Sequence, residues 1–285
     1  MSTKSGFVII DKPSGITSHD VVGKLRRALG TKRVGHAGTL DPMATGVLVL
    51  GINNATKFLQ YITEGKKSYS ATIRLGQATT TDDKEGTVIS SSDISEITEE
   101  QIRNFLQTQV GKIMQVPSKV SAIKIGGERA YDLVRQGKEV EIPAREVEIY
   151  DIQVLQITRD EFIDIEITVT CSAGTYIRAI ARDLGENLKV GGHLTALRRT
   201  LVAPFDLTDC TPLDAPELQD LTKAITKVMP SRLIDVTEVA ELRFGRAISK
   251  SEFAGVGVAV APDGQVAAII ENRDYGAQPL AVFVS

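Results

Sequence analysis

The sequence has 285 residues, of which 42% are hydrophobic and 24% charged, and this composition excludes a disordered or fibrous protein while leaving ample length for a core. Its apolar runs are too short to cross a bilayer and no secretory signal opens it, so we expect a cytoplasmic protein without membrane contact. The net charge of −3 does not by itself indicate a nucleic-acid-binding protein.

The first half of the chain is predicted to alternate strands, turns and helices. In chain order we expect a strand at 6–11, a helix capped by Thr17 or Ser18 and ended by Gly30, a strand at 47–50, a helix starting at Asn54 or Thr56, strands at 67–75 and 87–89, and a helix behind a Thr98 capping box. The stretch 24–33 carries five cations and no acid. It could form a basic face on an acidic protein, and a solvated helix surface explains it equally well.

The second half is predicted to extend the sheet and then to change character. In chain order we expect a strand at 120–125, a short helix at 131–136, two alternating strands at 147–157 and 162–171, helices at 175–188, 214–229 and 235–247, and a hairpin of 256–261 and 265–270 with its turn at 262–264. The two long strands have the pattern of antiparallel neighbours. A domain boundary is expected near 231–236.

The segment Gly35–Gly46 is the most informative part of the chain, because it sets His36 and Asp41 among three glycines directly before an apolar strand. Glycine permits positive φ, and Pro42 biases Asp41 towards an extended conformation. We therefore expect an ordered loop that holds a carboxylate outward, as reactive side chains often are held. Taken alone, an Asp at such a position is more often only a turn residue, and a His among glycines is more often a turn or surface residue than a catalyst.

Two later segments carry further unusual combinations. Arg178 follows a glycine turn at the start of a predicted helix, where its guanidinium could pair with a carboxylate that must stay ionised. The segment 194–199 sets the apolar Leu197 beside two cations. Read singly, Arg178 is explained by a surface salt bridge and Leu197 by the core.

Read together with residues 11–15 and 67–69, these segments and the glycine-rich loop resemble the bacterial TruB-type tRNA pseudouridine synthases, in the same order over about 6–199. The likeness weakens after Pro204. It implies an α+β fold with a mixed, mostly antiparallel central sheet flanked by helices, followed by a small β-rich PUA-like domain. It also implies chemistry without a metal or redox cofactor, and the two isolated cysteines offer no zinc motif or disulfide framework.

The resemblance implies four catalytic residues. Asp41 would be the essential carboxylate that attacks the substrate, and Arg178 would be its partner and keep its pKa low. Tyr69 would stack on the flipped base and help to remove the C5 proton. Leu197 would shape the pocket and exclude water.

The resemblance also places residues against RNA. His36 would insert into the T loop and so compensate for the stacking that a flipped base loses. Basic and glycine positions would approach the phosphates, and an acid and an aromatic residue would lie near the RNA loop. The expected RNA-binding residues are His36, Lys12, Gly15, Asp83, Tyr176, Arg26, Arg27 and Arg33.

These features imply an enzyme that isomerises uridine 55 in the T loop of tRNA. Residues 1–231 would form the catalytic domain and residues 232–285 the RNA-binding domain. The expected partner is the T arm and elbow of tRNA, bound by a monomer. Two alternatives stay open: an RNA-binding, tRNA-folding chaperone on the same scaffold, and a pseudouridine synthase that acts on ribosomal RNA.

Overall fold

The computed structural model of the chain describes residues 4–118, 124–125, 128–129 and 142–284. The helix predicted at 131–136 lies outside these residues, as does most of the strand predicted at 120–125. The described end of that strand, β8 (Lys124–Ile125), pairs with β9 (Glu128–Arg129).

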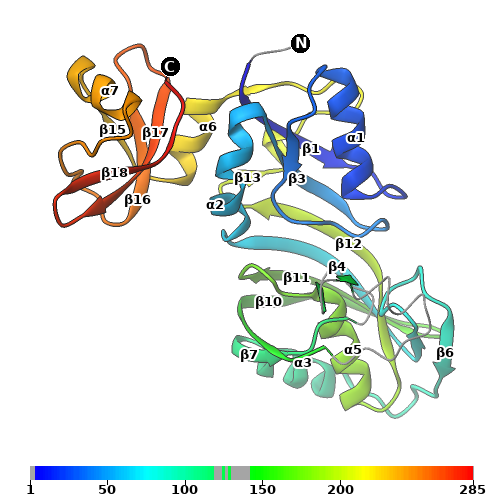
Figure 1. The fold of residues 1–285 in the computed structure, drawn as a ribbon. Coiled ribbons are helices and arrows are strands. Elements are labelled where there is room, and N and C mark those ends of the chain that lie inside the picture. The colour runs from blue at the N-terminus through cyan, green and yellow to red at the C-terminus, as the bar shows by residue number, and fades with distance from the viewer. Residues whose placement is uncertain (1–3, 119–123, 126–127, 130–141, 285) are drawn as a thin grey trace.

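A ten-stranded sheet runs through the larger part of the molecule (Figure 1). Its order is β14-β1-β3-β12-β4-β11-β10-β7, with β2 beside β3 and β13 beside β12. Its described strands pair antiparallel except β12 with β3, which confirms the mixed, mostly antiparallel sheet. The strands are β1 (Gly6–Lys12), β2 (Val34–His36), β3 (Thr45–Ile52), β4 (Lys67–Leu75), β7 (Gly111–Gln115), β10 (Arg145–Arg159), β11 (Ile163–Cys171), β12 (Gly192–Val202), β13 (Phe205–Asp206) and β14 (Gln219–Asp220).

The helices begin where the sequence offers caps. Thr17 and Thr98 each close a capping box, with Asp20 and Gln101 respectively, which confirms both predicted helix starts. No helix among the described residues is long and apolar enough to span a membrane. The helical segments are α1 (Ser18–Ala28), η1 (Asn53–Phe58), α2 (Leu59–Thr63), α3 (Glu99–Thr108), α5 (Ile177–Asn187), η2 (Leu207–Asp209), α6 (Leu221–Val228) and α7 (Val236–Arg243).

Strand β1 is buried on both faces because its side chains alternate between two hydrophobic clusters. Val8 and Ile10 enter the cluster that α1, α3 and α5 complete. Phe7 and Ile9 enter the other cluster, which η1, α2 and α6 complete. Figure 1 shows α1 on one side of β1 and β3, with α2 and α6 on the other. The uninterrupted apolar runs in these strands therefore reflect a sheet covered on both sides.

Two predicted helices differ from the structure. The helix expected at 214–229 is shorter, because Gln219 and Asp220 pair with the edge of β1 as β14. Asp220 then caps α6 through its side chain, which accepts from the amide of Lys223. The second predicted helix begins one residue early, at Asn53, as a 3₁₀ turn that continues into α2.

A second sheet forms the end of the chain, coloured orange to red in Figure 1. Its strands, in order, are β15 (Ser231–Leu233), β16 (Val256–Val260), β17 (Val266–Arg273) and β18 (Gly276–Val282), and the predicted β16–β17 hairpin is confirmed. Val258 and Ile269 pack into the same cluster as Phe58. The ring of Phe58 stacks on that of Phe283, with the ring centroids 5.2 Å apart. The small sheet thus shares a hydrophobic core with the larger part. A separate hairpin, β5 (Gln77–Thr79) with β6 (Val88–Ser91), projects beside β12.

Candidate active site

A cavity of about 290 Å³ opens between the loop 37–44, strands β4 and β12, and the start of α5. Gly46 makes this arrangement possible: its φ is +102°, and a Cβ there would lie 2.1 Å from the carbonyl oxygen of Arg199. The loop and β12 can approach each other this closely only because residue 46 is glycine. The lining residues are Gly38, Thr39, Leu40, Asp41, Thr63, Lys67, Tyr69, Arg145, Gly174, Thr175, Tyr176, Ile177, Arg178, Leu197 and Arg199.

Asp41 and Arg178 form a two-point ion pair at the wall of this cavity. Nη2 of Arg178 donates to Oδ1 of Asp41 at 3.1 Å, and Nε lies 3.0 Å from Oδ2. Arg178 is 4% exposed in the first turn of α5, directly after the turn at Gly174, whose φ is +86°. The structure therefore brings together the carboxylate and the guanidinium that the sequence places 137 residues apart.

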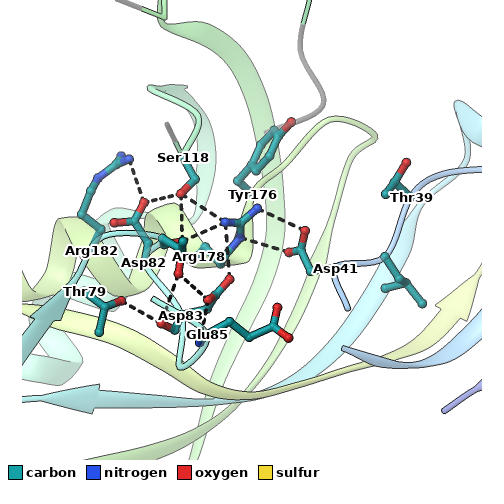
Figure 2. A network of polar contacts seen from close by, with 12 residues as sticks. Thr39, Asp41, Thr79, Asp82, Asp83, Glu85, Ser118, Tyr176, Arg178 and Arg182 are labelled. Atoms are coloured by element: carbon teal, nitrogen blue, oxygen red, sulfur yellow. Dashed lines mark hydrogen bonds and ion pairs between the residues drawn. The ribbon is translucent and has the colours of Figure 1, made fainter. Parts of the chain in front are cut away.

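A second carboxylate holds the other side of the same guanidinium (Figure 2). Nη1 of Arg178 lies 3.4 Å from Oδ2 of Asp83 and donates to the carbonyl of Thr81 at 2.8 Å. Asp83 is 3% exposed, and its Oδ1 accepts from the amide of Glu85 at 3.0 Å. Asp83 is expected to contact RNA, but the structure buries its carboxylate against Arg178, where it holds the guanidinium.

The pKa of Asp41 also departs from the expected direction. Burial raises the pKa of this carboxyl above its ordinary value, although the Arg178 guanidinium opposes the change. The nearby charge of Asp83 raises the pKa further. Desolvation and the second carboxylate thus oppose the low pKa that the ion pair with Arg178 alone would give Asp41.

Tyr69 and Leu197 lie on neighbouring strands β4 and β12 and both face the cavity. Each is 8% exposed. Burial raises the pKa of the Tyr69 phenol, and the nearby guanidinium of Arg199 opposes that change. A ring and an isobutyl group on adjacent strands give the cavity an apolar surface suited to a flat base.

Lys12 does not lie on the surface, where a phosphate-contacting cation is expected. Its side chain is fully buried, and its Nζ donates to the carbonyls of Pro13, Ile16 and Pro42 at 2.9, 2.7 and 3.1 Å. Burial lowers the pKa of Lys12 to about 8. Because all three ammonium donors are used internally, this residue ties the turn after β1 to Pro42, the neighbour of Asp41.

The remaining expected RNA-binding residues are accessible. Gly15 is exposed with a φ of +85°, and its amide donates to Pro42. His36 is half-buried at the end of β2, and burial lowers its pKa, so the imidazole is neutral near pH 7. Tyr176 is half-buried at the cavity, with the Arg145 guanidinium 4.8 Å from its ring centroid. The other three expected RNA-binding residues are exposed cations: Arg26, Arg27 and Arg33.

Three cations that line the cavity have no role predicted from the sequence: Lys67, Arg145 and Arg199. A signal existed for two of them. Lys67 lies two residues before Tyr69, and Arg199 two residues after Leu197, so in strands each shares the face of its partner. Among the described residues, no group of three or more His, Cys, Asp or Glu side chains could hold a metal ion.

Known proteins match both the sequence and the fold. The model of the TruB family pseudouridylate synthase N-terminal domain matches residues 26–177, that of the tRNA pseudouridylate synthase B C-terminal domain matches 178–236, and that of the tRNA pseudouridine synthase II C-terminus matches 229–284. A curated tRNA pseudouridine synthase B of Mycobacterium sp. strain KMS is 54% identical, covering 94% of this chain and 92% of its own length. One of Corynebacterium glutamicum strain R is 52% identical, covering 99% and 96%.

Solved structures agree with this fold. A chain in the structure of an H/ACA ribonucleoprotein bound to a substrate RNA containing 2′-deoxyuridine has a TM-score of 0.72 at 22% identity, covering 98% of this chain and 85% of its own. A chain in a Cbf5-Nop10-Gar1 complex has a TM-score of 0.71 at 25% identity, with coverages of 98% and 84%. Fold and matches together define a pseudouridine synthase, an isomerase that modifies RNA. Within that class, the chain belongs to the TruB family.

Proposed function

We propose that this enzyme converts uridine 55 in the T loop of tRNA to pseudouridine. The observation that carries the proposal is the two-point pair of Asp41 with Arg178 in a cavity that Tyr69 and Leu197 also line. Curated relatives named tRNA pseudouridine synthase B support tRNA as the substrate. The reaction breaks the bond from C1′ to N1 of uracil, forms a bond from C1′ to C5, and transfers a proton away from C5 and onto N1.

Asp41 is the group proposed to act at the sugar. Its carboxylate either adds to the ribose or assists the departure of the uracil, and both routes require the ionised form. Arg178 holds both carboxylate oxygens, so it fixes their direction as well as their charge. Asp83 in turn prevents the guanidinium from turning away, because it pairs with Nη1 from the opposite side.

Tyr69 and Leu197 are the groups proposed to act at the base. The phenol ring offers a face on which a flipped uracil can stack, and its oxygen can accept the C5 proton after rejoining. Leu197 fills the neighbouring wall and keeps water from the reacting atoms.

The surface around the cavity is proposed to hold the T arm. A neutral His36 suits insertion between bases better than contact with a phosphate, because its ring is uncharged. The exposed guanidinium groups of Arg26, Arg27 and Arg33 suit phosphates, and the open backbone at Gly15 allows RNA to approach closely. Tyr176 suits a stacking contact at the mouth of the cavity.

We also propose that the protein acts in the cytoplasm as a monomer, with residues 1–231 as the catalytic domain and residues 232–285 as an RNA-binding domain of the PUA type. The second sheet begins at Ser231, which supports a division there. The shared cluster around Phe58 would keep the two parts in a fixed relation when tRNA binds.

Incubation of the purified enzyme with an unmodified tRNA transcript tests the proposal. Pseudouridine mapping should find a single new site at position 55, and a transcript with cytidine at that position should gain none. Parallel incubation with ribosomal RNA tests the alternative substrate. Modification of ribosomal RNA alone, or of another tRNA position, would contradict the proposal.

Lys12→Met is expected to lower the free energy of unfolding by about 1–3 kcal/mol, because three carbonyls lose their common donor. Urea unfolding measures this loss. The slope of tRNA affinity against salt concentration should stay unchanged, because the side chain does not reach a phosphate. Arg27→Met is the matched control: it should reduce that slope by about one without loss of stability. A reduced slope in the Lys12→Met variant would instead show that Lys12 contacts a phosphate.

A further inference from the structure

Arg199 is a buried cation that binds the loop carrying Asp41. It is 1% exposed on β12, and its guanidinium donates to three carbonyls. Nε donates to Val47 at 2.8 Å, Nη1 to Thr39 at 3.3 Å and Nη2 to Gly38 at 3.1 Å. The last two carbonyls lie two and three residues before Asp41, so the position of this loop depends on Arg199.

The same guanidinium reaches Tyr69. Arg199 and Tyr69 are directly paired across the antiparallel strands β12 and β4, and both line the cavity. The charge of the guanidinium acts on the phenol, because it opposes the rise in the pKa of Tyr69 that burial causes. An arginine has five N–H donors, and three carbonyls use only three of them. One side chain therefore connects the loop of the proposed nucleophile with the residue proposed to take the C5 proton.

The positive charge of Arg199 is not neutralised by an ion pair within the part of the chain that the structure describes. Its effect on neighbours is visible. It opposes the rise in the pKa of Tyr69 that burial causes, and it adds to the burial that lowers the pKa of Lys67 to about 8. A phenolate at Tyr69 would thus face a buried cation whose charge is otherwise balanced only by carbonyl dipoles.

We propose that Arg199 is a positioning residue for the second half of the reaction, in which it aligns the Tyr69 oxygen with the Asp41 loop and stabilises that oxygen as a phenolate. The proposal rests on the proposed function, in which Tyr69 receives the proton from C5 after the new C1′–C5 bond has formed. The Tyr69 phenol first gives its proton to solvent. The bond from hydrogen to C5 then breaks, its electron pair forms the C5–C6 double bond, N1 takes a proton from solvent, and the C5 proton passes to the phenolate oxygen. Arg199 itself neither gives nor takes a proton.

Arg199→Gln keeps a hydrogen-bond donor but removes the charge, and Arg199→Lys keeps the charge. Single-turnover rates are measured on a tRNA whose target uridine carries deuterium or hydrogen at C5. We expect Arg199→Gln to be slower by about 10²-fold and to show a larger deuterium isotope effect than the wild type, because C5 proton removal then limits the rate. The limb of rate against pH that reports the Tyr69 phenolate should move to higher pH. Arg199→Lys should recover part of both losses.

Two further measurements keep the test decisive. Because Arg199 also holds the loop, Arg199→Gln should still slow the Tyr69→Phe variant, but by a smaller factor than it slows the wild type if Arg199 acts through Tyr69. Arg74→Gln, on the same sheet and paired with Asp164, is the control and should match the wild type. A slow Arg199→Gln with an unchanged isotope effect would overturn the proposal, since the residue would then only support the loop. If the wild type makes no pseudouridine at all, the proposed function fails instead.

Discussion

Asp41→Asn should abolish pseudouridine formation while leaving tRNA binding intact. Loss of an essential nucleophile typically costs about 10⁴-fold or more in turnover, and no nearby group can replace this one. Asp83 pairs with the same guanidinium, but it is 3% exposed and is not among the residues that line the cavity. Asparagine matches aspartate in shape, so the loop should persist, and the amide oxygen can keep one of the two contacts with Arg178. Single-turnover formation of pseudouridine and a filter-binding affinity for tRNA measure the two effects separately.

Asp164→Asn is a matched control for this substitution. Asp164 also pairs with an arginine through both oxygens, at 2.8 and 2.7 Å to Arg74, and its side chain is 30% exposed against 31% for Asp41. It lies on β11, away from the cavity lining. Loss of the ion pair alone should therefore leave turnover unchanged. Measurable turnover by Asp41→Asn would show that the Asp41 carboxylate is not the nucleophile.

Local sequence signals predicted the elements that depend on local contacts. The Thr17 and Thr98 capping boxes fixed two helix starts, since each cap bonds to a residue three positions away. The helix predicted at 214–229 is too long, because Gln219 and Asp220 pair with the edge of β1, more than 200 residues earlier in the chain. Helical spacing carries no information about such a distant partner.

The same limit applies to the site. The Asp41–Arg178 pair was predicted because a family resemblance supplied the distant contact, which no spacing reveals. Lys12 was placed on RNA because an exposed lysine in a turn is the ordinary case, whereas here three carbonyls turn inward to meet it. Arg199 could have been found, because it shares a strand face with Leu197. The contact of Arg199 with the Asp41 loop could not have been found from the sequence, because that contact depends on the parallel pairing of β12 with β3.

Arg178→Lys should lower turnover by about 10²- to 10³-fold and move the acid limb of the pH–rate profile upward. A lysine is a single point charge, so it cannot hold both oxygens of Asp41 and also pair with Asp83. Arg178 opposes the rise in the pKa of Asp41, so a weaker partner leaves that pKa still higher. The ionised fraction of Asp41 falls as the pH falls through its pKa. The variant should therefore lose activity at a higher pH than the wild type and recover part of it as the pH rises.

Arg182→Lys separates this effect from a general change in α5. Arg182 lies one turn further along the helix and pairs with Asp82 at 3.6 Å, on the side away from Asp41 (Figure 2). It should keep both the rate and the acid limb of the wild type. Profiles of kcat/KM against pH that are parallel for Arg178→Lys and the wild type would mean that Arg178 does not control the ionisation of Asp41. The rate loss would then come only from a misplaced carboxylate, and Arg178 would contribute by orienting both oxygens of Asp41.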